Sequence, residues 1–156
     1  MSSTNMENGT DLLQQAEYAM RNRANKAGIF YAITCVDRTV LEQQALYSMG
    51  REPLASVNLK RSKAGLYLLK SQVENVRVTG TLHSMHLTDA THPKSRAFDI
   101  VIPDGNKKAT YDLKVNVNQN QYNDYTELAM IGRDVGLYPG AFFSSPDFPH
   151  YQIVKP

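Results

Sequence analysis

The sequence predicts an α+β fold in which a small antiparallel sheet packs on helices. Apolar residues recur with helical periodicity near both ends of the chain, and short runs rich in β-branched and aromatic residues lie between and after these helices. The expected order is helix, strand, helix, a less legible middle, two strands, helix and two strands. This order is typical of an α+β fold.

Three helices are expected from apolar periodicity and capping residues. The first covers residues 11–26, where Thr10 or Asp11 can cap the N-terminus. The second covers residues 40–49, and the last covers residues 122–135. A glycine follows each helix within two residues, as is common at helix C-termini.

Strands are expected where short apolar runs are bounded by polar or turn-forming residues. In the middle of the chain, Pro53 could open a further helix to about residue 69, although Gly65 weakens that pattern. Residues 103–106 have the composition of a turn. The expected strands cover residues 29–36, 84–87, 96–102, 142–143 and 151–154.

Length and composition indicate one globular catalytic domain over residues 1–156, with residues 1–10 expected to be flexible. Hydrophobic residues make up 42% and charged residues 21% of the chain, as in ordinary globular proteins. The net charge of +2 is too nearly balanced for a nucleic-acid binder. The densest basic cluster, Lys60, Arg61 and Lys63, is expected to be a solvated helix face. We expect a monomer with no nucleic-acid partner.

Cys35 is the only cysteine, so an intramolecular disulfide is excluded. Its place in an apolar run predicts a buried, inert thiol rather than a nucleophile. The N-terminus lacks the basic and apolar regions of a secretory signal, and no apolar run approaches the roughly 20 residues of a membrane helix. We therefore expect synthesis in a cytoplasm and no stable membrane insertion.

The four histidines are candidates for a metal site. His83, His86 and His92 lie within ten residues of one another, and His150 lies near the C-terminus. A catalytic zinc site requires three protein ligands and an open position for water. A nearby carboxylate must usually take the proton of that water.

Two carboxylates could complete such a site. Asp99 lies inside an apolar run, where a buried carboxylate is costly unless it is paired or bound to a metal. Alternatively, Asp99 faces solvent or pairs with Arg96. Asp147 precedes His150 by three residues across a turn that contains two prolines. A carboxylate and an imidazole in this arrangement could share one metal-bound water.

Together these segments resemble the zinc peptidases that include D-alanyl-D-alanine carboxypeptidases and the L-alanyl-D-glutamate endopeptidases that bacteriophages use as endolysins. That family carries Ser-x-His-x-x-Gly-x-Ala-x-Asp and, later, Asp/Glu-x-x-His before a final strand. Residues 81–88 (TLHSMHLT) and 96–100 (RAFDI) match the two halves of the first motif, and residues 147–150 (DFPH) match the second. Residues 37–47 are similar to the family's arginine-bearing turn and following helix.

This resemblance implies a role for each matching residue. His86, Asp99 and His150 match the ligands of a zinc ion, which would lie on the sheet. Asp147 matches the general base. Arg38 matches an arginine that holds substrate or stabilises the developing oxyanion, a role suited to its fixed charge. Alternatively, Arg38 forms a salt bridge at the start of the following helix.

The spacing of the first motif departs from the family. Twelve residues separate His86 from Asp99, where relatives have six, and residues 89–94 read as an insertion. Ser95 stands in place of the motif glycine. His92 has the family spacing to Asp99 and is a rival first ligand, but the richer match around His86 favours His86.

A second departure is the absence of tryptophan, which relatives often carry before the final acidic motif. Tyr138, Phe142 and Phe143 could line that wall instead. This difference bears on the substrate more than on the metal.

We therefore expect a zinc-dependent peptidoglycan peptidase of the endolysin type. Its expected target is a stem-peptide bond, with L-alanyl-D-glutamate as first choice and D-alanyl-D-alanine as second. It would be made in the host bacterial cytoplasm without a signal peptide and would act at the cell wall after release. The alternative from another class is a non-catalytic, metal-binding module that binds the cell wall.

Overall fold

The computed structural model describes residues 2–156 and confirms the predicted α+β fold. One five-stranded sheet has the order β1-β2-β5-β4, and β3 pairs with β2 outside this path. All strand pairs are antiparallel. The strands are β1 (Ala32–Cys35), β2 (Ala97–Pro103), β3 (Ala109–Thr110), β4 (Tyr138–Pro139) and β5 (His150–Gln152).

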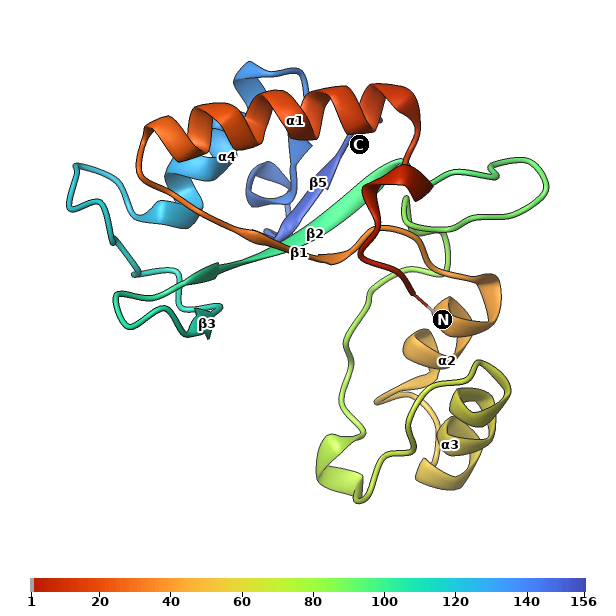
Figure 1. Cartoon of the computed structure of the whole chain (residues 1–156). Coiled ribbons are helices and arrows are strands. Elements are labelled where there is room, and N and C mark those ends of the chain that lie inside the picture. Colours follow the sequence, from red (N-terminus) through yellow and green to blue (C-terminus); the bar gives the residue numbers. More distant parts are fainter. Residues whose placement is uncertain (1) are drawn as a thin grey trace.

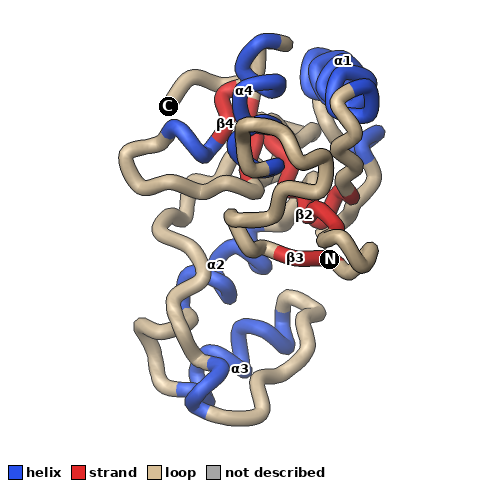
Figure 2. Tube along the Cα trace, turned by 90° about the vertical axis from the view of Figure 1, so that its left-hand side faces the viewer, coloured by secondary structure: helices blue, strands red, loops and turns tan. Residues whose placement is uncertain are grey.

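The helices form two groups around this sheet (Figure 1). Helices α1 (Asp11–Lys26) and α4 (Asp124–Asp134) pack together over the sheet, whereas α2 (Val40–Ser48) and α3 (Leu54–Lys63) lie apart from it, beyond the end of β1. Figure 2 shows the same separation after a quarter turn. Three short 3-10 helices complete the fold: η1 (Met6–Asn8), η2 (Gln72–Glu74) and η3 (Gly140–Phe142).

The main core lies between the sheet and the α1–α4 pair. Alternate residues of β2, namely Phe98, Ile100 and Ile102, are buried in this core. The ring of Tyr151 on β5 stacks on Phe98, with ring centroids 5.4 Å apart. Because side chains alternate across a strand, Asp99 and the residues on either side of Tyr151 point to the opposite face. That face carries the candidate site.

Local capping explains where the first two helices begin. The Thr10 side chain accepts a hydrogen bond from the Leu13 amide, as predicted for the start of α1. At the start of α2, Thr39 and Glu42 form a reciprocal capping box. This box fixes the backbone immediately after Arg38.

Two expected strands are not formed, and one strand was not expected. Residues 84–87 form a turn, in which Leu87 makes only a single bridge with Arg38. Phe142 is the last residue of η3 and Phe143 lies in a bend after it, so neither is in the sheet, and the strand nearest to them is β4. Strand β3 was not expected, because two residues are too few to show the alternation that predicts a strand. A short apolar run is thus a poor predictor of a strand where no neighbouring strand is available to pair with it.

The N-terminal segment is hydrogen-bonded to the rest of the chain, although residues 1–10 are expected from the sequence to be flexible. The Val36 amide donates to the Ser3 carbonyl at 2.7 Å, and the Ser95 amide donates to the Asn8 carbonyl at 2.8 Å. These contacts connect the segment to the end of β1 and to the residues just before β2.

Among residues 2–156, none of the helices combines the length and the apolar character needed to cross a bilayer.

Candidate metal centre

The candidate site is built on one row of residues across the sheet. Asp99 on β2 lies opposite Cys35 on β1 and opposite His150 on β5. Residues directly opposite each other in an antiparallel pair share a face. The register of β1 shifts between Ile33 and Cys35, so that Thr34 is the extra residue of a bulge. The bulge brings Cys35 onto the same face as Asp99.

His86 reaches this row from the turn that precedes β2. Its ring is buried, with 2% exposure, and its Nδ1 lies 2.8 Å from the Val36 carbonyl oxygen. The His86 backbone is held as well, because its carbonyl accepts a hydrogen bond from the Arg38 amide at 2.9 Å. His86 is therefore positioned at both its backbone and its ring.

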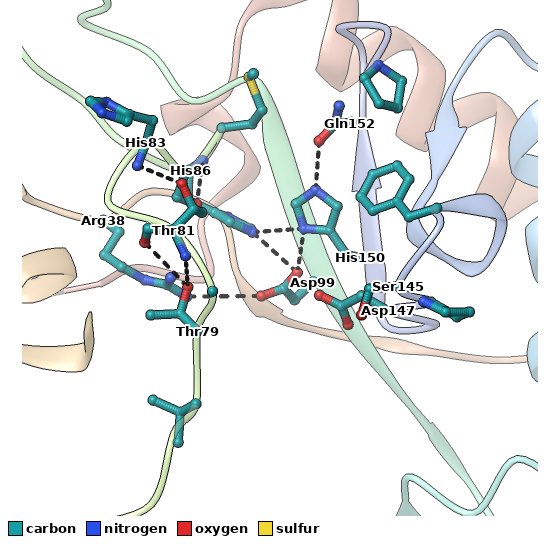
Figure 3. A pocket seen from close by; sticks show the side chains of 17 residues that line it. Arg38, Thr79, Thr81, His83, His86, Asp99, Ser145, Asp147, His150 and Gln152 are labelled. Atoms are coloured by element: carbon teal, nitrogen blue, oxygen red, sulfur yellow. Dashed lines mark hydrogen bonds and ion pairs between the residues drawn. The ribbon is translucent and has the colours of Figure 1, made fainter. Parts of the chain in front are cut away.

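The ligating atoms of His86, Asp99 and His150 converge on one point (Figure 3). Asp99 Oδ1 lies 3.1 Å from His86 Nε2 and 3.0 Å from His150 Nδ1. The two imidazole nitrogens lie 3.2 Å apart. All three distances are short enough for a hydrogen bond between the two atoms or for a cation bound by both of them.

Hydrogen-bond acceptors on the far side of each ring set the tautomers. The Val36 carbonyl requires a hydrogen on Nδ1 of His86. His150 Nε2 lies 2.9 Å from Gln152 Oε1, whose amide nitrogen donates to the Val154 carbonyl, so Nε2 of His150 carries a hydrogen. In the neutral rings, the lone pairs of His86 Nε2 and His150 Nδ1 therefore both point at Asp99.

Two lone pairs and a carboxylate in one place need a positive charge between them. Burial opposes a charge on His86, but the hydrogen bonds and charges of Asp99 and Cys35 together outweigh it and raise the pKa of His86 to about 10. Burial also disfavours the charged form of Asp99, yet hydrogen bonds from His150 and His86 hold its pKa well below its usual range. Without a metal, the cluster holds a proton, and a metal ion would take its place.

The donor set fits a tetrahedral zinc ion. Zinc binds imidazole nitrogen and carboxylate oxygen at about 2.0–2.2 Å, which places tetrahedral ligands roughly 3.3 Å apart. The three observed separations are close to this value. In metal-binding histidines, the ring nitrogen that does not bind the metal usually donates a hydrogen bond to an acceptor, as the two rings do here.

Cys35 offers a competing third ligand. Its sulfur, His86 and Asp99 form a group whose ligating atoms all lie within 4.8 Å of one another. However, Cys35 Sγ lies 3.7 Å from His86 Nδ1, the nitrogen already bound to the Val36 carbonyl. His150 instead faces the free nitrogen of His86. The geometry favours His150 over Cys35 as the third ligand.

Arg38 borders the same cluster. Its Nη2 lies 3.9 Å from Asp99 Oδ2, and its Nη1 donates to Gln43 Oε1 at 2.8 Å. Gln43 is itself anchored through the Thr81 carbonyl. The guanidinium is thus held beside the site as a fixed positive charge, and it lines the adjoining pocket.

The cluster opens into a pocket of about 530 Å³ that is also lined by Asp147, Phe143 and residues 78–81. The Asp147 carboxylate accepts no hydrogen bond from any group in residues 2–156, and its side chain lies beside Asp99 (Figure 3). Partial burial and the negative charge of Asp99 raise the pKa of Asp147. A carboxylate of this kind is suited to take up a proton.

His92, the rival first ligand, lies away from the cluster. Its side chain is exposed, and its Nδ1 lies 3.7 Å from Asp89 in the loop before β2. His83 lines the pocket but makes no contact with the converging atoms in the part of the chain that the structure describes. The structure therefore brings His86, and neither of the other two, together with Asp99 and His150.

Sequence reasoning did not identify three residues that hold the site in place. Ser95 is fully buried, and its hydroxyl lies 2.6 Å from the Val36 carbonyl that also binds His86. Gln152 fixes the tautomer of His150 from two residues away. Gly140 packs against the turn that carries Asp147. The two-residue spacing of His150 and Gln152 on one strand face was the available signal for Gln152.

Comparison with solved structures places this fold beside a peptidase. The chain is similar to the crystal structure of the Serratia marcescens L-Ala D-Glu endopeptidase ChiX, with a TM-score of 0.52 and 15% sequence identity. The similarity covers 99% of this chain and 89% of that one. The likeness is one of fold. No protein-family model matches the chain, and no curated protein matches it.

Gly140 generates a prediction about the integrity of the site. A Cβ at this position would lie 2.2 Å from the Asp147 carbonyl oxygen and 3.0 Å from His150 Cβ. We expect Gly140→Ala to lower the free energy of unfolding by roughly 1–3 kcal/mol, because the turn must move. Urea denaturation measures this change. Gly105→Ala is the matched control, since its Cβ would meet no atom within 4 Å. Equal stability of the two variants would contradict this account.

Proposed function

We propose that this chain is a zinc-dependent peptidoglycan peptidase of the endolysin type, which hydrolyses the L-alanyl-D-glutamate bond of the stem peptide. One observation carries the proposal: His86, Asp99 and His150 aim two lone pairs and a carboxylate at one point beside an open pocket. The fold is similar to that of a protein described as an L-Ala D-Glu endopeptidase. The motif resemblance noted in the sequence supports the same reading.

In this proposal, His86 Nε2, Asp99 Oδ1 and His150 Nδ1 would hold a zinc ion. Zinc at such a site polarises a scissile carbonyl and lowers the pKa of a coordinated water to about 7. Arg38 contributes a fixed positive charge at the pocket wall, where it stabilises negative charge that develops on the carbonyl oxygen.

Asp147 acts as the general base. Its carboxylate accepts the proton of the attacking water and passes it to the leaving amine. Two features support this role: the side chain lies in the pocket without a hydrogen-bond partner in residues 2–156, and its pKa is raised by burial and by the charge of Asp99. A raised pKa makes this carboxylate a stronger base than an ordinary aspartate, so it takes the proton from water more readily.

The first prediction separates the candidate ligands. We expect His86→Ala to lose bound zinc, since it removes one of three converging atoms, whereas His92→Ala and Cys35→Ser should keep about one zinc per chain. Elemental analysis of each purified variant after dialysis gives the metal content. Loss of zinc from Cys35→Ser with retention in His150→Ala would replace His150 with Cys35 in the ligand set.

The second prediction separates catalysis from metal binding. Asp147→Asn should retain zinc but lower the rate of peptidoglycan digestion by roughly 10²–10⁴-fold, because the amide cannot accept the proton. Turbidity of a cell-wall suspension measures the rate, and mass spectrometry of the wild-type digest identifies the bond. Full activity of Asp147→Asn would refute the assigned base. Release of D-alanine alone would favour the D-alanyl-D-alanine bond instead.

The third prediction concerns the tautomer of His150. Gln152→Leu removes the oxygen that accepts from Nε2, and zinc affinity should fall by roughly 10–100-fold. Gln152→Glu keeps an oxygen at this position, so its zinc affinity should fall less, although it loses the N–H group that donates to the Val154 carbonyl. Competition with a chromophoric chelator measures the affinities. Equal affinity of the leucine variant and the wild type would show that Gln152 does not act on the site.

A further inference from the structure

A second cavity, of about 570 Å³, lies next to the candidate catalytic pocket and has no role in the mechanism above. It is formed where the end of α4, the β4–η3 segment and the C-terminal residues meet. Its walls are mainly apolar and aromatic, with two positively charged side chains. The residues that matter for the argument are Arg133, Tyr138, Phe142, Phe143 and Lys155.

The two cavities adjoin each other, because Phe143 and Pro156 line both of them. The Phe143 ring also lies against His150, with ring centroids 5.7 Å apart. A substrate whose scissile bond lies at the metal site can therefore extend past Phe143 into the second cavity.

Two of the side chains that line this cavity are charged, and both are positive. Arg133 and Lys155 line it, no acidic side chain does, and neither cation has an ion-pair partner in residues 2–156. The Arg133 guanidinium lies over the Phe142 ring, 5.2 Å from its centroid. This cation–π contact holds the guanidinium in place but leaves its N–H groups free to bind an anion. The contact with Phe142 could by itself explain Arg133 as a structural residue. It does not explain why Lys155 lines the same cavity.

We propose that the second cavity is a subsite for a carboxylate-bearing residue of the substrate, next to the bond that is cut. Arg133 and Lys155 bind the free carboxylate, and the rings of Tyr138 and Phe142 pack against the hydrocarbon part of that residue. This inference rests on the proposed function and specifies its substrate. It predicts a preference for stem peptides with a free glutamyl carboxylate over those in which this carboxylate is an amide.

The test compares two synthetic tripeptides, L-Ala–D-Glu–L-Lys and the same peptide with the free glutamyl carboxylate converted to an amide. Wild-type protein should show a KM roughly three- to tenfold lower for the acid than for the amide. The double variant Arg133→Gln/Lys155→Gln should lose this preference, because its KM for the acid peptide rises to that for the amide. The control Lys26→Gln/Lys63→Gln removes the same charge far from the cavity and should keep the preference.

Two outcomes would overturn the subsite. One is an unchanged preference in the Arg133→Gln/Lys155→Gln variant, and the other is an equal loss of kcat for both peptides, which indicates a structural effect. If the wild type cleaves neither peptide, the proposed function fails, and binding decides the subsite separately. The acid peptide should then shift the amide NMR signals of Gly136 and Tyr138 in the wild type and not in the double variant. Absence of shifts in the wild type would also overturn it.

Discussion

The candidate site depends on the register of β2 against both of its neighbours. Asp99 lies opposite Cys35 on one side and His150 on the other, so one row of the sheet carries three of the side chains that meet at the site. A slip of one residue between β2 and β5 would turn His150 into the core and Tyr151 toward the pocket. The stacking of Tyr151 on Phe98 opposes such a slip. Core packing therefore also aligns the candidate ligands.

The Val36 carbonyl links this row to the residues that come from outside the sheet. It accepts from His86 Nδ1 at 2.8 Å, and the Ser95 hydroxyl lies 2.6 Å away from it. Through these contacts, the end of β1 fixes both the turn before β2 and the start of β2 itself. The electrostatic consequence is a cluster that is neutralised only by a proton or a cation. These contacts hold the three side chains in place without a metal, as the proposed metal site requires.

The sequence was most informative where a residue contradicts its local pattern. Asp99 is a carboxylate within an apolar run, and His150 begins a strand after a turn with two prolines, so both could be recognised without coordinates. The α+β class followed from clear helical periodicity at 11–26 and 122–135. Positions that act through the backbone could not be recognised in this way. Gly140 matters because the Asp147 carbonyl lies where its Cβ would be, and no local pattern encodes that contact.

The choice between His86 and His92 shows why spacing along the chain is a weak guide to a metal site. The segment between His86 and Asp99 closes on itself: the Arg96 amide donates to the Met85 carbonyl, and the amides of Thr91 and His92 donate to Asp89. Doubling the length of a flexible loop costs only about 0.6 kcal/mol of closure entropy. Added residues can therefore project outward while the two ends stay paired. The number of residues between two ligands is free to vary, whereas their strand register and backbone anchors are not.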